Sequence, residues 1–307
     1  DAIACEFENV PAASLPLLEQ YKPVRPAASA VRVCQDRREE KAFLTRAGVP
    51  VAPNLTLLPG EPLPALPSDL FPAILKTARE GYDGKGQWTI HNAGELPAAL
   101  AASGVPCVLE KRLPLEGEFA LTLARSPSGA ISALPLVQNW HSGGILDQTR
   151  SPAKVPALEA EAQRIAEHII AALDYVGVLT VEFFLVGGAL LVNEMAPRPH
   201  NSGHPSIDNA GCSQFELQVR ALCDLPLPAQ AEVQPAILLN LLGDLWQDGT
   251  PDWAGALALP GVHLHLYGKG DARPGRKMGH VTVTGRNWPT VEATASQLRA
   301  LLGLPPR

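Results

Sequence analysis

The chain has 307 residues, 46% of them hydrophobic, which is enough for two or three compact units with sizeable cores. Its formal net charge of −6 and the lack of a long basic run argue against a nucleic-acid-binding surface. No apolar run approaches the roughly 20 residues of a membrane span, and the five cysteines are scattered without a CxxC pair, as in proteins with reduced thiols. We therefore expect a cytoplasmic protein with no nucleic-acid or membrane partner.

The first fifty residues are typical of the last part of a parallel α/β domain. We expect a short strand at residues 2–7, a helix around residues 15–21 and a proline-bounded strand at residues 23–26. The helix expected at residues 36–47 begins with Asp36 as its N-cap and ends before a glycine. Because the chain starts without methionine and directly in a strand, we expect that the first part of this domain is missing.

A glycine-rich segment follows the buried strand expected at residues 71–77. Three glycines fall within residues 81–86, so the backbone N–H groups of this loop can approach phosphates closely. Lys76 and Lys85 add positive charge on either side. The alternative is a plain hairpin turn, because glycine-rich hairpin tips are common.

Polar residues surround the strand expected at residues 107–111. Glu110 and Lys111 end this strand, and Glu118 follows after a linker. Such an arrangement is typical of an adenine and ribose pocket. A hinge between two domains would have the same residues, so both interpretations remain open.

An antiparallel sheet is expected to continue through strands at residues 119–124 and 131–138. In the loop expected at residues 139–144, His141 stands before a glycine pair, where it faces a phosphate or simply closes the loop. Apolar residues at helical spacing then predict a helix at residues 155–173. We expect it to pack beneath the hairpin that follows.

Residues 178–204 carry the clearest chemical signal. Glu182 interrupts an otherwise apolar strand at residues 178–186, on the same side as Thr180 and Phe184. Two glycines separate this strand from a returning strand at residues 189–194. If the loop has three residues, Glu182 lies directly opposite Glu194, with Cβ atoms roughly 4.5 to 5.5 Å apart. A two-residue loop would put the two glutamates on opposite faces.

Two carboxylates this close repel each other unless one is protonated or a cation lies between them. With Asn193 beside them, they form an oxygen-only set that suits Mg²⁺, although two solvated glutamates on an exposed face are the simpler alternative. The proline-bounded residues that follow favour a site, because Arg198 can grip an oxyanion and His200 can titrate near neutrality. Metal ligands that lead into an anion clamp suggest phosphoryl transfer.

The C-terminal region adds histidines and basic residues after a helix at residues 215–222 and a buried strand at residues 236–242. His263, His265 and Tyr267 alternate on one face of an expected strand. The loop after it contains four basic residues, Lys269, Arg273, Arg276 and Lys277. A His-x-His pair on a strand can ligate zinc, but no other histidine or cysteine lies nearby at a suitable spacing, so we expect an anion pocket there.

Four motifs in order along the chain closely resemble one family of ATP-grasp enzymes, the N5-carboxyaminoimidazole ribonucleotide synthetases, which are the ATPase subunits of phosphoribosylaminoimidazole carboxylase. The motifs lie at residues 8–11 (ENVP), 81–87, 193–204 and 273–280 (RPGRKMGH). The resemblance implies an α/β (α+β) ATP-grasp fold with a truncated N-terminal parallel α/β domain and a small C-terminal sheet. It implies three parts, which are an N-terminal remnant at 1–50, a small ATP-grasp domain at 51–125, and a large one at 126–307.

The resemblance also implies a reaction. Bicarbonate attacks the γ-phosphate of ATP to give carboxyphosphate, and this anhydride, or CO₂ released from it, carboxylates 5-aminoimidazole ribonucleotide in purine biosynthesis. Glu182 and Glu194 match the family's Mg²⁺ ligands. Arg198 matches the group that holds bicarbonate and carboxyphosphate, and the resemblance implies a homodimer.

Further residues match the family's site positions. His200 and Tyr82 would handle the proton of the amine, while Lys269 and Arg276 would hold the ribonucleotide phosphate or the new carboxylate. The residues implied for ATP are Arg37, Lys76, Gly81, Tyr82, Asp83, Gly84, Lys85, Gly86, Gln87, Glu110, Lys111, Arg112, Leu113, Glu118, His141, Asn193 and Glu194.

One departure lies at the start of the chain, where nothing matches the family's first glycine-rich phosphate loop. If the chain is complete as given, we expect weak ATPase activity without efficient ligation. The alternatives are another ATP-grasp ligase, of the glycinamide ribonucleotide transformylase or biotin carboxylase type, or a non-catalytic ATP-binding remnant. The run at residues 275–280 (GRKMGH) favours the first interpretation.

Overall fold

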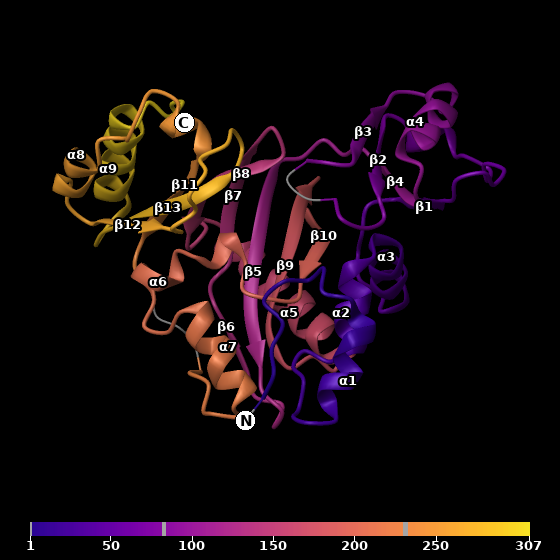
Figure 1. Ribbon diagram of the computed structural model, residues 1–307, viewed down its shortest axis with the longest axis horizontal. Coiled ribbons are helices and arrows are strands. Elements are labelled where there is room, and N and C mark those ends of the chain that lie inside the picture. The colour runs from indigo at the N-terminus through magenta and orange to yellow at the C-terminus, as the bar shows by residue number, and fades with distance from the viewer. Residues whose placement is uncertain (1, 82–83, 230–232) are drawn as a thin grey trace.

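Two antiparallel sheets organise the protein, one of four strands and one of nine. The computed structural model describes residues 2–81, 84–229 and 233–307. In Figure 1 the small sheet lies at one upper corner, the C-terminal elements lie at the other, and long strands run downward between them. Among the described helices, none is both long enough and apolar enough to cross a bilayer.

Three helices precede the first sheet: α1 (Leu15–Glu19), α2 (Ala28–Gln35) and α3 (Arg37–Arg46). The N-cap of α3 is confirmed, since Oδ1 of Asp36 accepts the backbone N–H of Arg38 at 3.0 Å. The two strands expected before it are reduced to one parallel bridge between Ile3 and Val24. Prolines on both sides of Val24 supply no backbone N–H, which limits the ladder. Helix α2 was not predicted.

The small sheet has the order β1-β4-β2-β3 and is covered by α4 (Leu96–Ser103). Its strands are β1 (Asn54–Leu57), β2 (Ala73–Thr77), β3 (Gln87–Ile90) and β4 (Cys107–Lys111). Leu75 and Leu109 pair directly on neighbouring strands and pack with Leu100 of α4 in one apolar core. Strands β2 and β4 confirm the predictions, and they carry Lys76 and Glu110 toward the large sheet.

The large sheet begins with six strands, β5 (Gly117–Arg125), β6 (Ile131–Ala133), β7 (Val137–Ser142), β8 (Ile145–Ser151), β9 (Gly177–Val186) and β10 (Ala189–Ala196). Their order is β10-β9-β5-β7-β8, with β6 paired to β5. The single strand expected at residues 131–138 is split in two because Pro135, which lacks an N–H, interrupts the ladder. Strand β7 extends to Ser142, so His141 lies on a strand and not in the expected loop.

Helices cover the two faces of these strands differently. The predicted helix α5 (Pro156–Ala172) packs Ile165 and Ile169 against Val181 of β9 on one face. On the other face, α7 (Gln214–Leu222) covers only the first residues of β9, with Leu217 near Val178. Side chains alternate along a strand, so Glu182 projects from the α7 face but beyond the reach of α7. This leaves room for a site.

The C-terminal part consists of β11 (Ala236–Leu242), α8 (Trp253–Ala258), β12 (Val262–Leu266), β13 (Lys277–Thr284) and α9 (Trp288–Leu301). Strand β11 pairs with β8, so the small C-terminal sheet continues the large one in the order β8-β11-β13-β12. Leu239, Val281 and Leu298 form its apolar core. Strand β13 begins at Lys277, inside the segment that the sequence analysis treated as a basic loop.

The sheets also divide the chain in the middle. Strand β5 pairs with β9 along its whole length, so residues 117–125 belong to the large sheet. The boundary expected at residue 125 falls at the end of this strand. We propose that the small ATP-grasp domain ends between residues 111 and 117, where the chain leaves one sheet for the other.

Candidate active site

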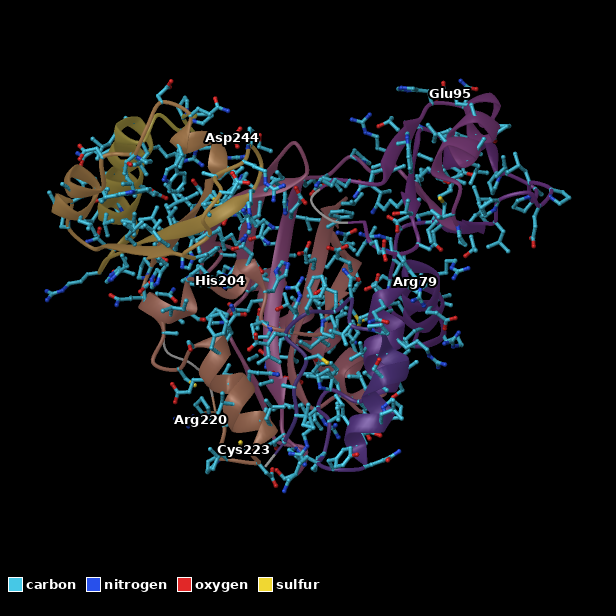
Figure 2. The ribbon with its side chains drawn as sticks, viewed as in Figure 1. Arg79, Glu95, His204, Arg220, Cys223 and Asp244 are labelled. Atoms are coloured by element: carbon cyan, nitrogen blue, oxygen red, sulfur yellow. The ribbon has the colours of Figure 1, made fainter. Side chains whose placement is uncertain are left out.

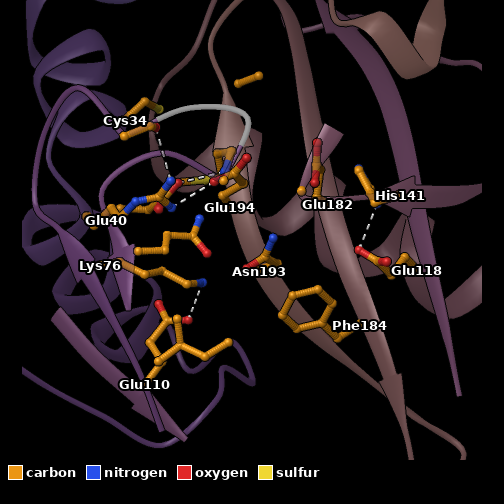
Figure 3. A pocket seen from close by; sticks show the side chains of 18 of the residues that line it. Cys34, Glu40, Lys76, Glu110, Glu118, His141, Glu182, Phe184, Asn193 and Glu194 are labelled. Carbon is orange, nitrogen blue, oxygen red and sulfur yellow. Dashed lines mark hydrogen bonds and ion pairs between the residues drawn. The ribbon is translucent and has the colours of Figure 1, made fainter. Parts of the chain in front are cut away.

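A cavity of about 1240 Å³ lies where the small sheet, the large sheet and the N-terminal helices meet. Figure 3 shows its lining from close by, with Lys76 and Glu110 on one side and Glu182, Glu194 and His141 on the other. The lining is rich in both acidic and basic side chains. Such a space suits a polyanionic ligand accompanied by cations.

The turn of the β9–β10 hairpin is shorter than predicted. Val186 pairs with Ala189, so the loop has only two residues, and the expected three-residue loop is wrong. Gly187 and Gly188 both have positive φ, +57° and +75°. A two-residue type I′ hairpin turn requires this conformation at both positions, which glycine adopts without strain.

The two glutamates nevertheless lie opposite each other, as predicted. A β-bulge between Val192 and Glu194 inserts Asn193 into strand β10 and shifts the register by one residue. Beyond the bulge, Glu194 pairs with Glu182. The statement that a two-residue loop would separate the carboxylates is therefore wrong for this hairpin, because the bulge compensates for the short turn.

The surroundings give the two carboxyl groups opposite pKa shifts. Burial and the neighbouring Glu194 raise the pKa of Glu182. Burial also acts to raise the pKa of Glu194, but the guanidinium of Arg37, 2.7 Å from its Oε2, outweighs this effect and lowers the pKa. The pair thus avoids mutual repulsion by keeping one member close to protonation.

The same residues fit a hard divalent cation. Glu182 and Glu194 present carboxylate oxygens from neighbouring strands, and Oδ1 of Asn193 is buried with no hydrogen-bond partner within the described residues. An all-oxygen set of this kind is what Mg²⁺ takes in proteins, usually completed by substrate phosphates and water. A cation here would also remove the repulsion between the two carboxylates.

Cations on the opposite wall are held by a buried ion-pair network. Nζ of Lys76 donates to Glu110 at 2.6 Å, and Nζ of Lys41 lies 3.2 Å from the same carboxylate. Lys41 also donates to the carbonyl oxygen of Asn193 at 2.7 Å, which ties helix α3 to the bulge. Burial acts to raise the pKa of Glu110, but the two lysines outweigh it and lower the pKa to about 2.

A histidine on β7 completes the charged lining. Nδ1 of His141 lies 3.0 Å from Oε2 of Glu118 on the neighbouring strand β5. Burial acts to lower the pKa of His141, but this contact with Glu118 raises it overall. The contact with Glu118 therefore favours the imidazolium form, which is the form that can neutralise a phosphate.

The predicted anion clamp is held by the N-terminal segment. The guanidinium of Arg198 makes a two-bond contact with the carboxylate of Glu8, and its Nη2 donates to Oε1 at 2.7 Å. His200 lies beside it, with Nε2 3.1 Å from Glu182. Burial and the charge of Arg198 lower the pKa of His200 to about 3. The ring is therefore neutral, whereas the sequence analysis expected it to titrate near neutrality.

Comparison with known proteins matches two family models to this chain. The ATP-grasp domain matches residues 42–215, more than half of the chain, and the phosphoribosylaminoimidazole carboxylase C-terminal domain matches residues 236–294. The N5-carboxyaminoimidazole ribonucleotide synthase of Pseudomonas aeruginosa is 40% identical over 304 residues, which cover 98% of this chain and 82% of that protein. The chain belongs to the N5-carboxyaminoimidazole ribonucleotide synthase family.

Solved structures from the same family agree. The N5-carboxyaminoimidazole ribonucleotide synthetase from Thermus thermophilus aligns with a TM-score of 0.88 and 39% identity, covering 100% of this chain and 83% of that one. The Aspergillus clavatus N5-carboxyaminoimidazole synthase, solved with ADP and 5-aminoimidazole ribonucleotide, aligns with a TM-score of 0.87 and 30% identity, covering 99% and 82%. The ATP-grasp fold predicted from the sequence is thereby confirmed.

Most residues that the family resemblance implied come together in the cavity. Those in its lining are Arg37, Lys76, Gly81, Gly84, Gln87, Glu110, Lys111, Arg112, Leu113, Glu118, His141, Glu182, Asn193, Glu194, Arg198 and His200. Tyr82 and Asp83 lie outside the described residues. The individual roles of all these residues in the N5-carboxyaminoimidazole ribonucleotide synthase reaction stay predictions.

Four of the implied residues lie outside that lining: Lys85, Gly86, Lys269 and Arg276. Nζ of Lys269 donates to the carbonyl oxygen of Lys277 at 2.6 Å, and Nη1 of Arg276 donates to that of Asp271 at 2.7 Å. Lys277, next in the chain to Arg276, does line the cavity. The segment that carries these cations thus borders the site without filling it.

Sequence reasoning missed three residues that shape the site. Lys41 and Glu40 of α3 are both only 2% exposed, although they belong to a run of charged residues that resembles a solvated helix face. The backbone N–H of Met195 donates to Glu40, and burial raises the pKa of that carboxyl to about 8. Glu8 belongs to the first family motif, but nothing in the sequence indicates its contact with Arg198.

Proposed function

We propose that this chain carboxylates 5-aminoimidazole ribonucleotide with bicarbonate and ATP, giving N5-carboxyaminoimidazole ribonucleotide, ADP and phosphate. The observation that carries the proposal is the meeting of three features in one cavity. Glu182 and Glu194 face each other, and Lys76 lies on the opposite wall of the cavity. Arg198 also belongs to the lining of this cavity. Family membership supplies the substrates that fit this arrangement.

The first step transfers the γ-phosphoryl group of ATP to bicarbonate. A bicarbonate oxygen forms a bond to the γ-phosphorus while the bond from that phosphorus to the bridging oxygen breaks, and ADP leaves with the electron pair. Lys76 and His141 would neutralise the phosphate oxygens, and Arg198 would hold the bicarbonate oxyanion. Mg²⁺, held by Glu182 and Glu194, would supply further charge neutralisation. Preorganised cations in a site with little water carry most of the rate enhancement of such a step.

The second step transfers the carboxyl group. The exocyclic amine of the ribonucleotide forms a bond to the carboxyl carbon while the carbon–oxygen bond to phosphate breaks. The phosphate leaves with the electron pair and accepts the proton that the amine loses. Arg198 keeps the carboxylate in place during this exchange. His200, with its lowered pKa, is neutral before the step, so it adds no positive charge beside the amine.

We propose a cytoplasmic homodimer as the setting of this reaction. All five cysteines are unpaired, which fits a reducing compartment. Light scattering coupled to size-exclusion chromatography measures the oligomeric state directly. A mass of twice the chain supports the dimer, and a monomeric mass at working concentrations contradicts it.

Substrate-dependent ADP release tests the proposed function. We expect ADP formation that requires both bicarbonate and 5-aminoimidazole ribonucleotide. Equal or greater ADP formation with glycinamide ribonucleotide or biotin would instead indicate another ATP-grasp ligase. Binding of ATP and Mg²⁺ in isothermal titration, without turnover of any amine, would indicate an ATP-binding remnant.

A further inference from the structure

A second cluster of possible ligands lies outside the cavity, where α6 (Ser206–Asn209) meets the β12–β13 pair. His265 of β12 pairs directly with His280 of β13, and their rings stack at 17° with centroids 4.5 Å apart. Nε2 of His265 lies 2.9 Å from Oδ2 of Asp208 of α6. The nearest available donor atoms of these three residues all lie within 4.8 Å of one another. None of the three belongs to the lining of the ATP cavity.

His280 is the residue that points to a ligand. Its side chain is buried, with the residue 1% exposed, and its Nε2 has no hydrogen-bond partner within the described part of the chain. A buried polar atom without a partner destabilises the fold unless something binds it. Nδ1 of the same ring lies 2.8 Å from the hydroxyl of Tyr267. In metal-binding histidines, one ring nitrogen usually hydrogen bonds to an oxygen, which orients the ring, and the other ring nitrogen binds the metal.

The rings of His204, His265 and Tyr267 all contact the ring of His280. His204 packs against the same ring with centroids 5.1 Å apart, and Figure 2 marks its position between the central strands and the C-terminal part. None of these rings gives Nε2 of His280 a hydrogen-bond partner within the described residues, so this atom is available to a cation.

We propose that Asp208, His265 and His280 bind one divalent transition-metal ion of the zinc class. Two imidazoles and one carboxylate are the ligand set of Zn²⁺, Co²⁺ or Fe²⁺, whereas Mg²⁺ takes oxygen ligands such as the Glu182–Glu194 pair. Binding of a shared ion would draw together three donor atoms that already lie within 4.8 Å of one another.

The fold supplies what the sequence lacked. The His-x-His pair was rejected as a metal site because no third ligand lies near it along the chain. Asp208 arrives from 57 residues upstream and His280 arrives through strand pairing. His263, the other member of the pair, is 43% exposed with Nδ1 3.8 Å from Asp208, so this side chain or water can complete the coordination.

The position of the cluster indicates a structural role for the ion. It would join α6 to the β12–β13 pair beside Tyr267, which contacts His280 and whose ring lies 5.4 Å from Nζ of Lys269. An ion that binds the folded chain but not the unfolded one raises its stability. We therefore expect zinc to order the segment that carries Lys269, independently of ATP and Mg²⁺.

Zinc retention tests this site. Full-length chain is stripped with a chelator, given one equivalent of Zn²⁺ in a large excess of Mg²⁺, dialysed, and analysed for zinc by mass spectrometry. We expect one zinc per chain in wild type and in His91→Ala, which removes an exposed histidine of the small domain. His265→Ala and Asp208→Asn should each weaken zinc binding by at least about tenfold.

Two further measurements test whether the variants fold and whether nitrogen atoms bind the metal. Circular dichroism establishes that His265→Ala and Asp208→Asn are folded, and Co²⁺ added in place of Zn²⁺ reports nitrogen ligation through its visible absorption. Glu182→Gln removes the oxygen site and should retain zinc as wild type does. The proposal is overturned if wild type retains no more zinc than His265→Ala, or if Glu182→Gln loses zinc to the same extent. Neither result bears on the carboxylation reaction, so the two proposals fail separately.

Discussion

Replacing Glu110 with glutamine tests the buried ion-pair network that supports the site. This carboxylate lies 2.6 Å from Nζ of Lys76 and 3.2 Å from Nζ of Lys41, and all three side chains are buried. Glu110→Gln keeps the shape of the side chain but removes its charge. Two buried ammonium groups then lose the carboxylate that both contact, which is strongly destabilising.

The magnitude follows from the lowered pKa of Glu110. A shift from 4.5 to about 2 corresponds to about 3 kcal/mol of preference for the charged form in the folded state. The folded pKa lies below the unfolded one, so this stability is present above pH 4.5 and is lost as the pH falls toward 2. We expect Glu110→Gln to lower the free energy of unfolding by about 3 kcal/mol at pH 7. The difference from wild type should shrink in acid.

Urea denaturation of the ligand-free chain, followed by tryptophan fluorescence and circular dichroism, measures this difference. Glu61→Gln is the matched control, because Glu61 is an exposed glutamate of the same domain, and we expect its stability to equal that of wild type. A loss below about 1 kcal/mol for Glu110→Gln is what an exposed ion pair gives. That result, or a loss that stays constant down to pH 3, would refute the account of the network.

Three further substitutions test separate features. Glu8→Gln releases the two-bond hold on Arg198 and should raise KM for bicarbonate while KM for ATP stays near the wild-type value; equal changes in both would contradict a role at the anion clamp. Gly86→Ala should raise KM for ATP, because φ at Gly86 is +69° and a Cβ would lie 2.6 Å from Oγ1 of Thr77; an unchanged KM would show that the loop tolerates the strain. Tyr175→Phe removes a fully buried hydroxyl that donates to a backbone carbonyl at 2.8 Å. Urea denaturation should show that the free energy of unfolding falls by about 1 to 3 kcal/mol. An unchanged free energy of unfolding would show that the carbonyl finds another donor.

Local patterns predicted the elements that flank the site. Helix α5 and the hairpin strands β9 and β10 were predicted because apolar residues recur at helical or alternating spacing. The pairing of Glu182 with Glu194 was also predicted, but from an incorrect loop length. A bulge at Asn193 shifts the register by one residue. No local sequence pattern predicts this bulge, because it depends on how β10 packs against its neighbours.

Other features depend on contacts between distant segments. Lys41 and Glu40 resemble solvent-exposed helix residues in the sequence, and only the packing of α3 against β10 and β4 buries them. Asp208 and His280 are also distant from His265 in the sequence. Strand pairing brings His280 beside His265, and the packing of α6 brings Asp208 there. Spacing along the chain identifies ligands that are close in sequence and misses those that the fold brings together.

In the proposed reaction, the terminal phosphoryl group of ATP passes to an oxygen of bicarbonate. Turnover with freshly dissolved bicarbonate labelled with heavy oxygen, in ordinary water with 5-aminoimidazole ribonucleotide present, tests this transfer directly. If bicarbonate takes the phosphoryl group, the inorganic phosphate released carries one labelled oxygen, which mass spectrometry detects. Phosphate without the label, formed at the same rate as ADP, would mean that water takes the phosphoryl group and would contradict the account.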